Sequence, residues 1–421
     1  MNCFYYTLSM IFTRSCAPKF FTSTAKSLVL IILLFSCSST KQKIVDETQQ
    51  EQAANEKITT QINLTFAGDI MAHPVNFRQK DFSKIWQDLK SVLQGEDLCF
   101  ANIEAPVCDS LEWSGYPQFN MHSTYVKAAK DVGFNVFSLA NNHSNDWYLE
   151  GINETRTFFE RFEKTDGIYA CGLRKKNDSK ITHRIIEKNG WKILFVAFTE
   201  ILNRPDAANF VDYFPQKKQK ELIGTLKKLR EQNEADLFIV SVHTDEEEYK
   251  KQVTQSHRIF FKTLVKECKA DVIWANHPHV TKEFETIEVF DDETSRKAFI
   301  MYGNGNTISG QRTRPSLQKN PDERDDTGDG LLIKVKFQKE TLLNLKRDDA
   351  KNKKTKNKIT LTKIEPHLIT TYITPDGQFV VRLADEDFIH CLERSALLLW
   401  ANYIKSRIKI YEDLKGISKW Q

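Results

Sequence analysis

The sequence predicts an α/β protein, because short apolar runs alternate with longer amphipathic stretches from residue 61 onward. The runs are rich in β-branched and aromatic residues, which favours buried strands. We expect strands at 62–67, 98–101, 136–140, 193–198, 237–242, 272–275, 298–302 and 331–337. We expect helices at 82–93, 125–132, 151–163, 219–231 and 255–268.

The composition is that of a globular protein with a hydrophobic core. Of the 421 residues, 40% are hydrophobic and 28% are charged. The net charge is +4, and Arg14, Lys19 and Lys26 stand in the first 36 positions without an acidic residue. The rest of the chain therefore holds 57 basic residues, three fewer than the whole, against 56 acidic ones. This balance excludes binding driven by bulk charge, and we expect no nucleic-acid partner.

The eight cysteines do not form a metal-binding or redox motif. No two are spaced as CxxC, which disfavours a zinc ribbon or a thioredoxin-like site. We interpret the five that follow Cys37 as small buried apolar residues. A disulfide between Cys99 and Cys108 is the alternative if the compartment is oxidising.

The N-terminus has the features of an export signal. Residues 1–26 are basic and free of acids, and 28–35 form an apolar run too short to span a bilayer but as long as the core of a signal peptide. The run ends in Leu34-Phe35-Ser36-Cys37, which resembles a bacterial lipobox. We expect 1–36 to be a lipoprotein signal peptide and Cys37 to carry a lipid anchor in the membrane. A plain signal peptide with an incidental cysteine is the alternative.

Polar residues suited to binding metal follow nearly every predicted strand. In open α/β folds ligands bind outside the carboxyl ends of the strands, so these residues should converge in one crevice. The clusters are Gly68-Asp69, Asn102-Ile103-Glu104, Asn141-Asn142-His143, His243, Asn276-His277-Pro278-His279 and Asn304-Gly305-Asn306.

We predict a metal centre from the mixed oxygen and nitrogen donors of this set. Carboxylates with imidazoles suit Mn, Zn or Fe, and the set is large enough for one or two divalent ions. Glu104 would bridge two ions through its two oxygens, and Gly68 would let the chain turn beside Asp69. In an extended segment residues two apart point the same way, so His277 and His279 should face one crevice. The predicted ligands are Asp69, Glu104, Asn142, His243, His277 and His279.

The remaining polar residues of the strand ends have other predicted roles. His143 diverges from its neighbour Asn142, and we expect it to act as a general acid partnered by Asp146, with a structural histidine as the alternative. We expect substrate contacts from Asn102, Asn304 and Asn306. His183 and His257 lack such neighbours and are interpreted as structural, as is His122 in the segment after Pro117.

Five motifs together resemble the bacterial capsule-synthesis CapA family, also called PGA_cap, from about residue 62 to 312. They are Gly68-Asp69-Ile70-Met71, Phe100-Ala101-Asn102-Ile103-Glu104-Ala105-Pro106, Leu139-Ala140-Asn141-Asn142-His143-Ser144-Asn145-Asp146, Asn276-His277-Pro278-His279-Val280 and Tyr302-Gly303-Asn304-Gly305-Asn306. The resemblance implies a four-layer α/β/β/α sandwich related to calcineurin-like metallophosphatases. It also implies the ligand roles above and a part in making or exporting poly-γ-glutamate capsule.

The chain departs from that superfamily at one ligand position. Calcineurin-like metallophosphatases have a histidine two residues after the first aspartate, where this chain has Met71. The wider CapA family also lacks that histidine, so its loss is not peculiar to this chain. His73 is a candidate replacement. After His243 the family's Trp-Gly is replaced by Thr244-Asp245, and these changes bear on metal number and substrate shape more than on fold.

We therefore expect a lipid-anchored envelope protein in four segments. They are the signal peptide 1–36, a polar tether 37–60, a CapA-like domain 61–340 and a strand and helix extension 341–421. The favoured function is a metal-dependent hydrolase or transferase of capsule or poly-γ-glutamate synthesis. The alternatives are a non-catalytic lipoprotein that binds or assembles an envelope polymer, and a lipoprotein that stores metal. The lysine-rich stretch 345–358 would contact such an anionic polymer, or else is a solvated loop.

Overall fold

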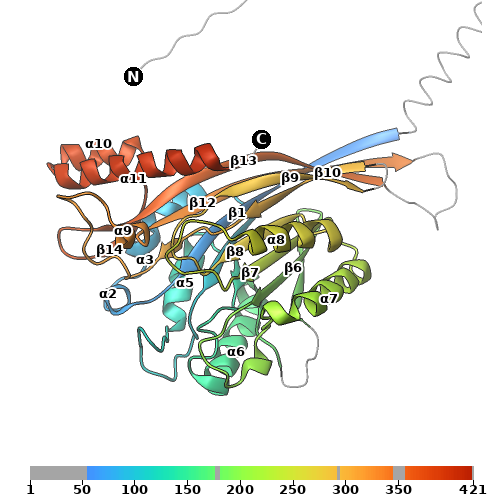
Figure 1. Ribbon diagram of the computed structural model, residues 1–421, viewed down its shortest axis with the longest axis horizontal. Helices are drawn as coiled ribbons and strands as arrows, with labels where there is room; N and C mark the ends of the chain where they lie inside the picture. Colours follow the sequence, from blue (N-terminus) through green and yellow to red (C-terminus); the bar gives the residue numbers. More distant parts are fainter. Residues whose placement is uncertain (1–54, 176–180, 292–293, 345–355, 420–421) are drawn as a thin grey trace, which may run out of the picture. The chain divides into compact units, whose positions relative to one another are not determined.

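The computed structural model describes residues 55–175, 181–291, 294–344 and 356–419 (Figure 1). The chain divides into two units, and the larger one, Ile58–Thr341 with Lys356–Gln421, contains the helices discussed below and all of the strands apart from the outermost residues of two. The predicted signal peptide, Cys37 and the tether up to residue 54 lie outside the described residues, as does most of the lysine-rich stretch. No helix in the described ranges has the length and apolarity that a membrane span requires.

The described strands form two sheets. The first has the order β14-β13-β12-β1-β2-β3-β4, with β11 paired to β1. Its strands are β1 (Asn55–Ile70), β2 (Leu98–Ile103), β3 (Val136–Ser138), β4 (Tyr169–Cys171), β11 (Asn306–Ile308), β12 (Asp329–Asn344), β13 (Lys356–Ile373) and β14 (Phe379–Leu383). The second sheet has the order β5-β6-β7-β8-β10-β9. Its strands are β5 (His183–Lys188), β6 (Trp191–Thr199), β7 (Leu237–His243), β8 (Val272–Asn276), β9 (Phe284–Asp291) and β10 (Thr294–Met301).

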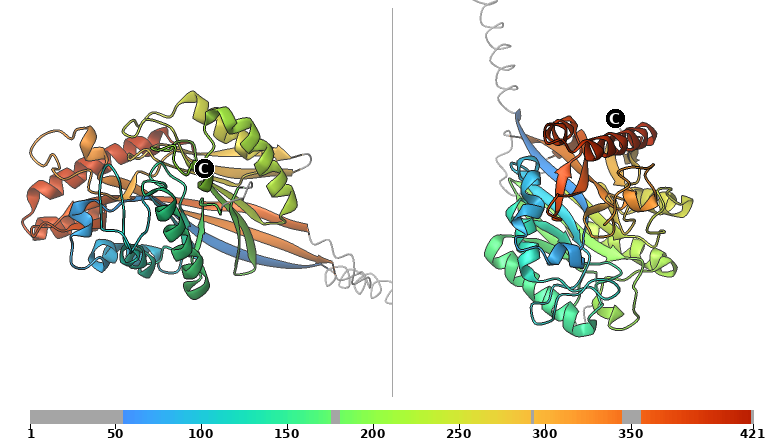
Figure 2. Two further views of the ribbon diagram at one scale, coloured as in Figure 1. Left: turned by 90° about the horizontal axis from the view of Figure 1, so that it is seen from below. Right: turned by 90° about the vertical axis from the view of Figure 1, so that its left-hand side faces the viewer.

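Helices cover the outer faces of the two sheets, which gives four layers (Figure 2, left). On the first sheet lie α5 (Ser123–Asp131) and α6 (Tyr148–Asp166), and on the second lie α7 (Gln219–Gln232) and α8 (Gln255–Glu267). Shorter helices are α2 (Pro74–Phe77), α3 (Ser83–Trp86), η1 (Gln87–Leu89), α4 (Lys90–Leu93), η2 (Ala208–Phe210), η3 (Gln216–Lys218) and α9 (Glu323–Asp326). The α/β/β/α sandwich implied by the resemblance is confirmed.

Strand β6 shows why the two sheets pack face to face. Phe195 and its alternate neighbours belong to the core between the sheets, whereas Leu194 and Val196 belong to the core under α7 and α8. Both faces are apolar, as expected of a strand buried on two sides. In the inter-sheet core Phe66 and Phe100 stack at 4.6 Å between ring centroids, and Phe100 meets Phe195 at 5.5 Å.

Several predicted elements differ in their bounds; the strand expected over 331–337, for example, runs from Asp329 to Asn344. Strand β1 begins at Asn55, so residues 55–60 are strand, although we expected them in the tether. Backbone pairing in a sheet does not require apolar side chains, so polar residues can form strand here. Next to this segment, the side chain of Gln61 donates to that of Gln338 on β12 at 3.3 Å. The helix predicted over 82–93 is divided into α3, η1 and α4.

The C-terminal region is built onto the first sheet. Strands β13 and β14 extend that sheet beyond β12, and α10 (Glu386–Arg394) and α11 (Leu398–Ile417) lie along them (Figure 1, red). Tyr372 of β13 packs against Phe388 of α10 and Trp400 of α11, with ring centroids 5.4 and 4.8 Å apart. The helical part of the extension expected over 341–421 is divided into two helices, because Ala396 adopts a left-handed conformation between them.

The topology brings the predicted site residues to one edge of the sandwich. Strands β1, β2 and β3 run parallel in the first sheet, and β6, β7 and β8 run parallel in the second. In register, Asp69 stands beside Asn102, and His243 stands beside Asn276. The indole Nε1 of Trp274 donates to the carbonyl of Ala67 at 2.8 Å, which ties the two sheets together just before these strand ends.

Candidate metal centre

The first predicted ligand, Asp69, is held by a close backbone contact. Its amide donates to the carbonyl of Gly305 at 3.0 Å, and the amide of Gly68 donates to Thr307 Oγ1 at 2.9 Å. A Cβ on Gly68 would lie 1.8 Å from the Gly305 carbonyl oxygen. The glycine is therefore required for this approach rather than for the turn that we expected.

Two groups of possible metal ligands meet at Glu104. One group is Glu104, His243 and His277, the other is Asp69, Glu104 and His279, and within each group the candidate ligand atoms lie within 4.8 Å of one another. Glu104 Oε1 lies 3.8 Å from His243 Nε2 and 3.7 Å from His279 Nε2. This is the shared position that a carboxylate bridging two cations would occupy.

Several buried atoms of these residues lack a hydrogen-bond partner among the described residues. They are Oδ2 of Asp69, both carboxylate oxygens of Glu104 and Nδ1 of His277. Buried polar atoms are nearly always satisfied, and an unpaired buried charge costs several kcal/mol. A bound cation would satisfy these lone pairs, so the residues present fit a metal.

The electrostatics of the centre favour the same interpretation. Burial, followed by the nearby Asp69, raises the pKa of Glu104 well above its usual value, and a bound cation would favour its ionised form. Burial, followed by the neighbouring histidines, lowers the pKa of His243 well below its usual value and that of His277 to about 3. The imidazoles are therefore neutral, which is the form that binds metal.

Asparagines surround this centre and orient its ligands. Asn142 Oδ1 lies 2.9 Å from His243 Nε2, and Asn102 donates to Asp69 Oδ1 at 2.8 Å. Asn306 Oδ1 lies 3.1 Å from His279 Nδ1; a proton on Nδ1 leaves Nε2 free as a ligand atom.

The three asparagines that we expected to contact substrate are all buried. Asn304 donates to the backbone carbonyls of Phe66 and Ala67 instead of facing a cavity. Asn102 and Asn306 contact the predicted ligands, as described above. The structure thus places all three around the centre.

His277 reaches the centre through an unusual backbone conformation. Its φ of 92° lies in a region that non-glycine residues rarely adopt, so the segment is not the extended strand that we assumed. The rings of His277 and His279 nevertheless lie on the same side, with centroids 6.0 Å apart, and His277 lies 4.9 Å from the ring of His243. Strain of this kind often marks functional positions.

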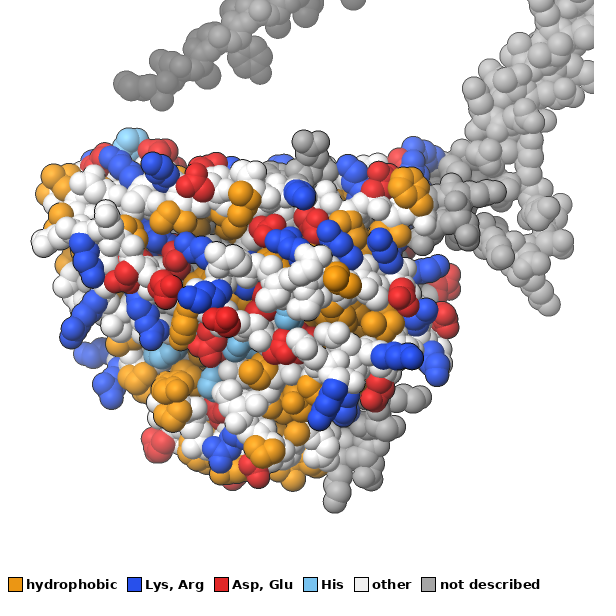
Figure 3. All heavy atoms as spheres, in the orientation of Figure 1, with side chains coloured by type: hydrophobic (Ala, Val, Ile, Leu, Met, Phe, Trp, Pro, Cys, Tyr) orange, Lys and Arg blue, Asp and Glu red, His pale blue; other side chains and the backbone are white. Residues whose placement is uncertain are grey.

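A pocket of about 530 Å³ opens beside the centre. Histidine and acidic side chains gather on this face of the protein (Figure 3). The lining residues are Met71, His73, Tyr116, Phe119, His143, Glu248, Tyr249, His279, Gln311 and Arg324. Glu248 and Tyr249 are the acid and aromatic residue that follow Thr244-Asp245 in the family resemblance, whereas nothing in the sequence pattern pointed to Gln311 or Arg324.

His143 faces this pocket as one half of a buried pair. Its Nδ1 lies 2.7 Å from Asp146 Oδ2, and the same oxygen accepts the amide of Phe119 at 2.7 Å. Asp146 therefore fixes the orientation of the imidazole. Neither residue belongs to the two ligand groups.

His73 lines the pocket without joining a ligand group. Its Nδ1 accepts the amide of Gly310 at 3.0 Å, and its ring packs edge-on against Phe119. Burial, followed by charges at His279 and His143, lowers its pKa to about 3, so it is neutral. Its Nδ1 is thus engaged by the backbone rather than available as a ligand atom.

The other histidines and cysteines make contacts away from the centre. His257 lies 2.7 Å from Glu200 and 3.3 Å from both Asp245 and Glu246, where its charge is matched. His122 Nε2 lies 2.7 Å from the carbonyl of Leu111. Among the described cysteines all are free; Cys99, Cys108, Cys171 and Cys268 are buried, and Cys391 is exposed.

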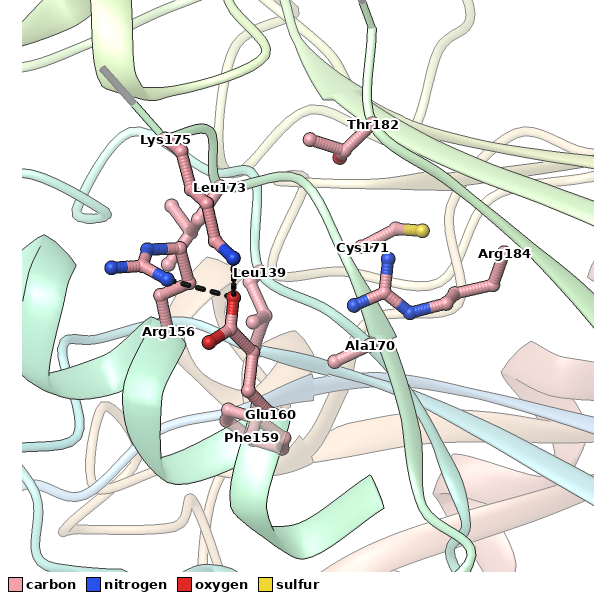
Figure 4. A pocket seen from close by; sticks show the side chains of 10 residues that line it. All are labelled: Leu139, Arg156, Phe159, Glu160, Ala170, Cys171, Leu173, Lys175, Thr182 and Arg184. Carbon is pink, nitrogen blue, oxygen red and sulfur yellow. Dashed lines mark hydrogen bonds and ion pairs between the residues drawn. The ribbon is translucent and has the colours of Figure 1, made fainter. Parts of the chain in front are cut away.

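A second pocket, of about 410 Å³, lies between α6, β4 and β5 (Figure 4). Its one acidic lining residue, Glu160, accepts from Arg156 at 2.7 Å and lies 3.3 Å from Lys175. It contains none of the predicted ligands.

The model of the family described as "Bacterial capsule synthesis protein PGA_cap" matches residues 63–311. This range is more than half of the chain and includes every residue of the two ligand groups. The chain belongs to the PGA_cap family.

Two relatives of this PGA_cap protein are named for capsule or PGA biosynthesis. The "Capsule biosynthesis protein CapA" of Bacillus anthracis is 26% identical over 73% of this chain and 74% of its own. The "PGA biosynthesis protein CapA" of Bacillus subtilis is 27% identical over 69% and 76%. Among solved structures, a putative 5'-nucleotidase from Staphylococcus aureus aligns with a TM-score of 0.40 at 12% identity, over 73% of this chain and 54% of that one.

Proposed function

We propose that this PGA_cap protein is a metal-dependent hydrolase or transferase that acts on a γ-linked glutamate polymer in the cell envelope. The observation that carries the proposal is the pair of ligand groups that share Glu104 beside a pocket containing a histidine and aspartate pair. The names of the two Bacillus relatives support the polymer and its synthesis as the setting.

The residues of the site divide into two roles. Asp69, Glu104, His243, His277 and His279 would hold one or two divalent ions such as Mn, Zn or Fe, with Asn142 beside them. Such ions supply Lewis acidity and lower the pKa of water.

His143 has a role of its own. Its protonated Nδ1 would donate a hydrogen bond to Asp146, so its Nε2 would be the atom that transfers a proton to or from the substrate in the pocket.

We also propose that Cys37 anchors the protein in the membrane. The support is the apolar run of residues 28–35, which ends at a small residue before Cys37. Labelling cells with radioactive palmitate should mark the wild-type protein but not Cys37→Ala. Equal labelling of both would refute the anchor.

A second candidate function is non-catalytic binding or assembly of an envelope polymer. Met71 lies in the pocket where metallophosphatases have a histidine, and Nδ1 of His73 is engaged by Gly310. On this view the polymer would bind equally well with and without metal. Strict dependence of binding or turnover on metal would contradict it.

Metal content tests the main proposal directly. Mass spectrometry should find one or two ions per chain in the wild type and none in His277→Ala/His279→Ala. The matched control, His183→Ala/His390→Ala, removes two histidines outside the centre and should keep the metal. A wild-type protein that stays metal-free after incubation with Mn²⁺ or Zn²⁺, or a double variant with full turnover of a γ-linked glutamate oligomer, would overturn the proposal.

A further inference from the structure

Arg324 on α9 is exposed at the pocket beside the metal centre, and the proposed mechanism gives it no role. Its guanidinium lies 4.9 Å from the ring centroid of Tyr249, which is itself 6.3 Å from the ring of His279. Within the described residues it forms no ion pair with a carboxylate. A guanidinium has five N–H donors, so Arg324 over the Tyr249 ring retains donors for an anion in the pocket.

The pocket lining also contains an acidic residue, which bears on the role of Arg324. Glu248 is the one acidic residue of the described lining, and its backbone carbonyl accepts the amide of His279 at 2.8 Å. A substrate anion at the centre would be repelled by that carboxylate. Arg324 is the lining residue that offsets this repulsion.

The segment that carries Arg324 is fixed from two sides. Lys250 lies 3.3 Å from Glu323 and Lys251 lies 2.8 Å from Asp326, so the loop after β7 is tied to α9. From the C-terminal helix α11, Arg407 binds Asp326.

The same helix holds the base of α9 through further buried contacts. The hydroxyl of Tyr403 donates to Asp325 Oδ1 at 2.8 Å, and Arg407 Nε donates to Asp329 Oδ2 at 2.5 Å. The position of Arg324 beside the pocket is therefore set by residues distant in sequence.

We infer that Arg324 binds a carboxylate of the substrate. This carboxylate belongs to the monomer unit next to the one whose bond is held at the metal centre. The guanidinium fork matches the two oxygens of a carboxylate, and Tyr249 spaces it from His279. The inference rests on the proposed function, since it takes the substrate to be a γ-linked glutamate chain, whose free α-carboxylates recur at every unit.

Binding of two matched oligomers tests the inference. The probes are a γ-linked glutamate tetramer with free α-carboxylates and the same tetramer with each α-carboxylate amidated. Titration calorimetry on the full-length, Mn²⁺-loaded protein should show about tenfold tighter binding of the acid. Arg324→Gln should remove that preference by weakening the acid alone, and Arg324→Lys should keep part of it.

The controls separate this inference from the proposed function. Lys319→Gln removes an exposed cation of the same segment outside the pocket and should leave both affinities unchanged. Metal content is measured on every variant, so an empty metal centre would refute the proposed function while the binding difference still decides the role of Arg324. An unchanged preference in Arg324→Gln, equal weakening of both tetramers, or a wild type that does not prefer the acid would overturn the inference.

Discussion

Nδ1 of His143 lies 2.7 Å from Oδ2 of Asp146, and both side chains are almost completely buried beside the metal centre. Because neither residue belongs to a ligand group, the proposed proton transfer and the proposed metal binding rest on different residues. The two functions of the site can therefore be tested one at a time.

We expect Asp146→Asn to lower kcat on a γ-linked glutamate oligomer by about 10²–10³-fold, because the amide cannot hold His143 in the same tautomer. The metal content, measured by mass spectrometry, should stay at the wild-type value. Asp206→Asn, a change of the same kind at an exposed position, should leave kcat unaltered. Wild-type turnover by Asp146→Asn would show that the pair does not transfer protons.

Gly68→Ala should destabilise the protein by about 3 kcal/mol and reduce its metal content, because the new Cβ would meet the Gly305 carbonyl oxygen and displace Asp69. Urea unfolding measures the first effect. The matched change Gly224→Ala, on α7 with no atom within 4 Å of the new Cβ, should stabilise the protein by about 0.5–1 kcal/mol. Equal effects of the two substitutions would show that the close contact at Gly68 does not matter.

His257 should make stability depend on pH in the alkaline range. Burial alone would lower its pKa, but hydrogen bonds to Asp245, Glu200 and Glu246 outweigh burial and raise it from 6.5 to about 11. Because folding raises this pKa, protonated His257 contributes fully to the stability of the folded protein below pH 6.5. This contribution is lost as the pH rises from 6.5 to about 11.

We expect His257→Gln to cost about 3–5 kcal/mol at pH 6, because it leaves buried carboxylates without their cation. The difference from wild type, measured by urea unfolding at pH 6, 8 and 10, should shrink as the pH rises. His390→Gln, at an exposed position, serves as the control. A difference that is constant or grows with pH would show that His257 is neutral in the folded protein.

Arg407→Met should destabilise the protein by about 3–5 kcal/mol, because Asp326 and Asp329 would lose a buried cation. Lys409→Met, at an exposed position of the same helix, should change the free energy of unfolding by less than about 0.5 kcal/mol. Guanidinium unfolding of both variants measures this contrast. Similar values for the two would mean that α11 is not held through Arg407.

The strands of the sandwich could be predicted because their signal is local. The apolar runs that became β6, β7 and β8 are recognisable from a few neighbouring residues. Four strands were missed. Strands β4 and β11 are only three residues long, and β5 and β9, at the edges of the second sheet, carry charged residues among their apolar ones. The break between α10 and α11 was missed because it depends on one left-handed residue, Ala396.

The convergence of Asp69, Glu104, His243, His277 and His279 could also be predicted from the sequence. Each follows a strand, and the carboxyl ends of parallel strands meet at one edge of a sheet. The positive φ of His277 and the carbonyl that passes over Gly68 carry no such signal, because both depend on how distant segments pack.

The sequence by itself determined the α/β class, the order of the strands that bear the candidate ligands, and the chemistry of those ligands. Tertiary structure alone decided that His257 is a buried cation and that Arg324 lies at the pocket. The physical reason is the distance along the sequence between the residues that interact. Strand identity and strand ends follow from neighbouring residues, whereas a pKa or a pocket wall depends on groups that folding brings together from as far apart as Glu200 and His257, or Asp326 and Arg407.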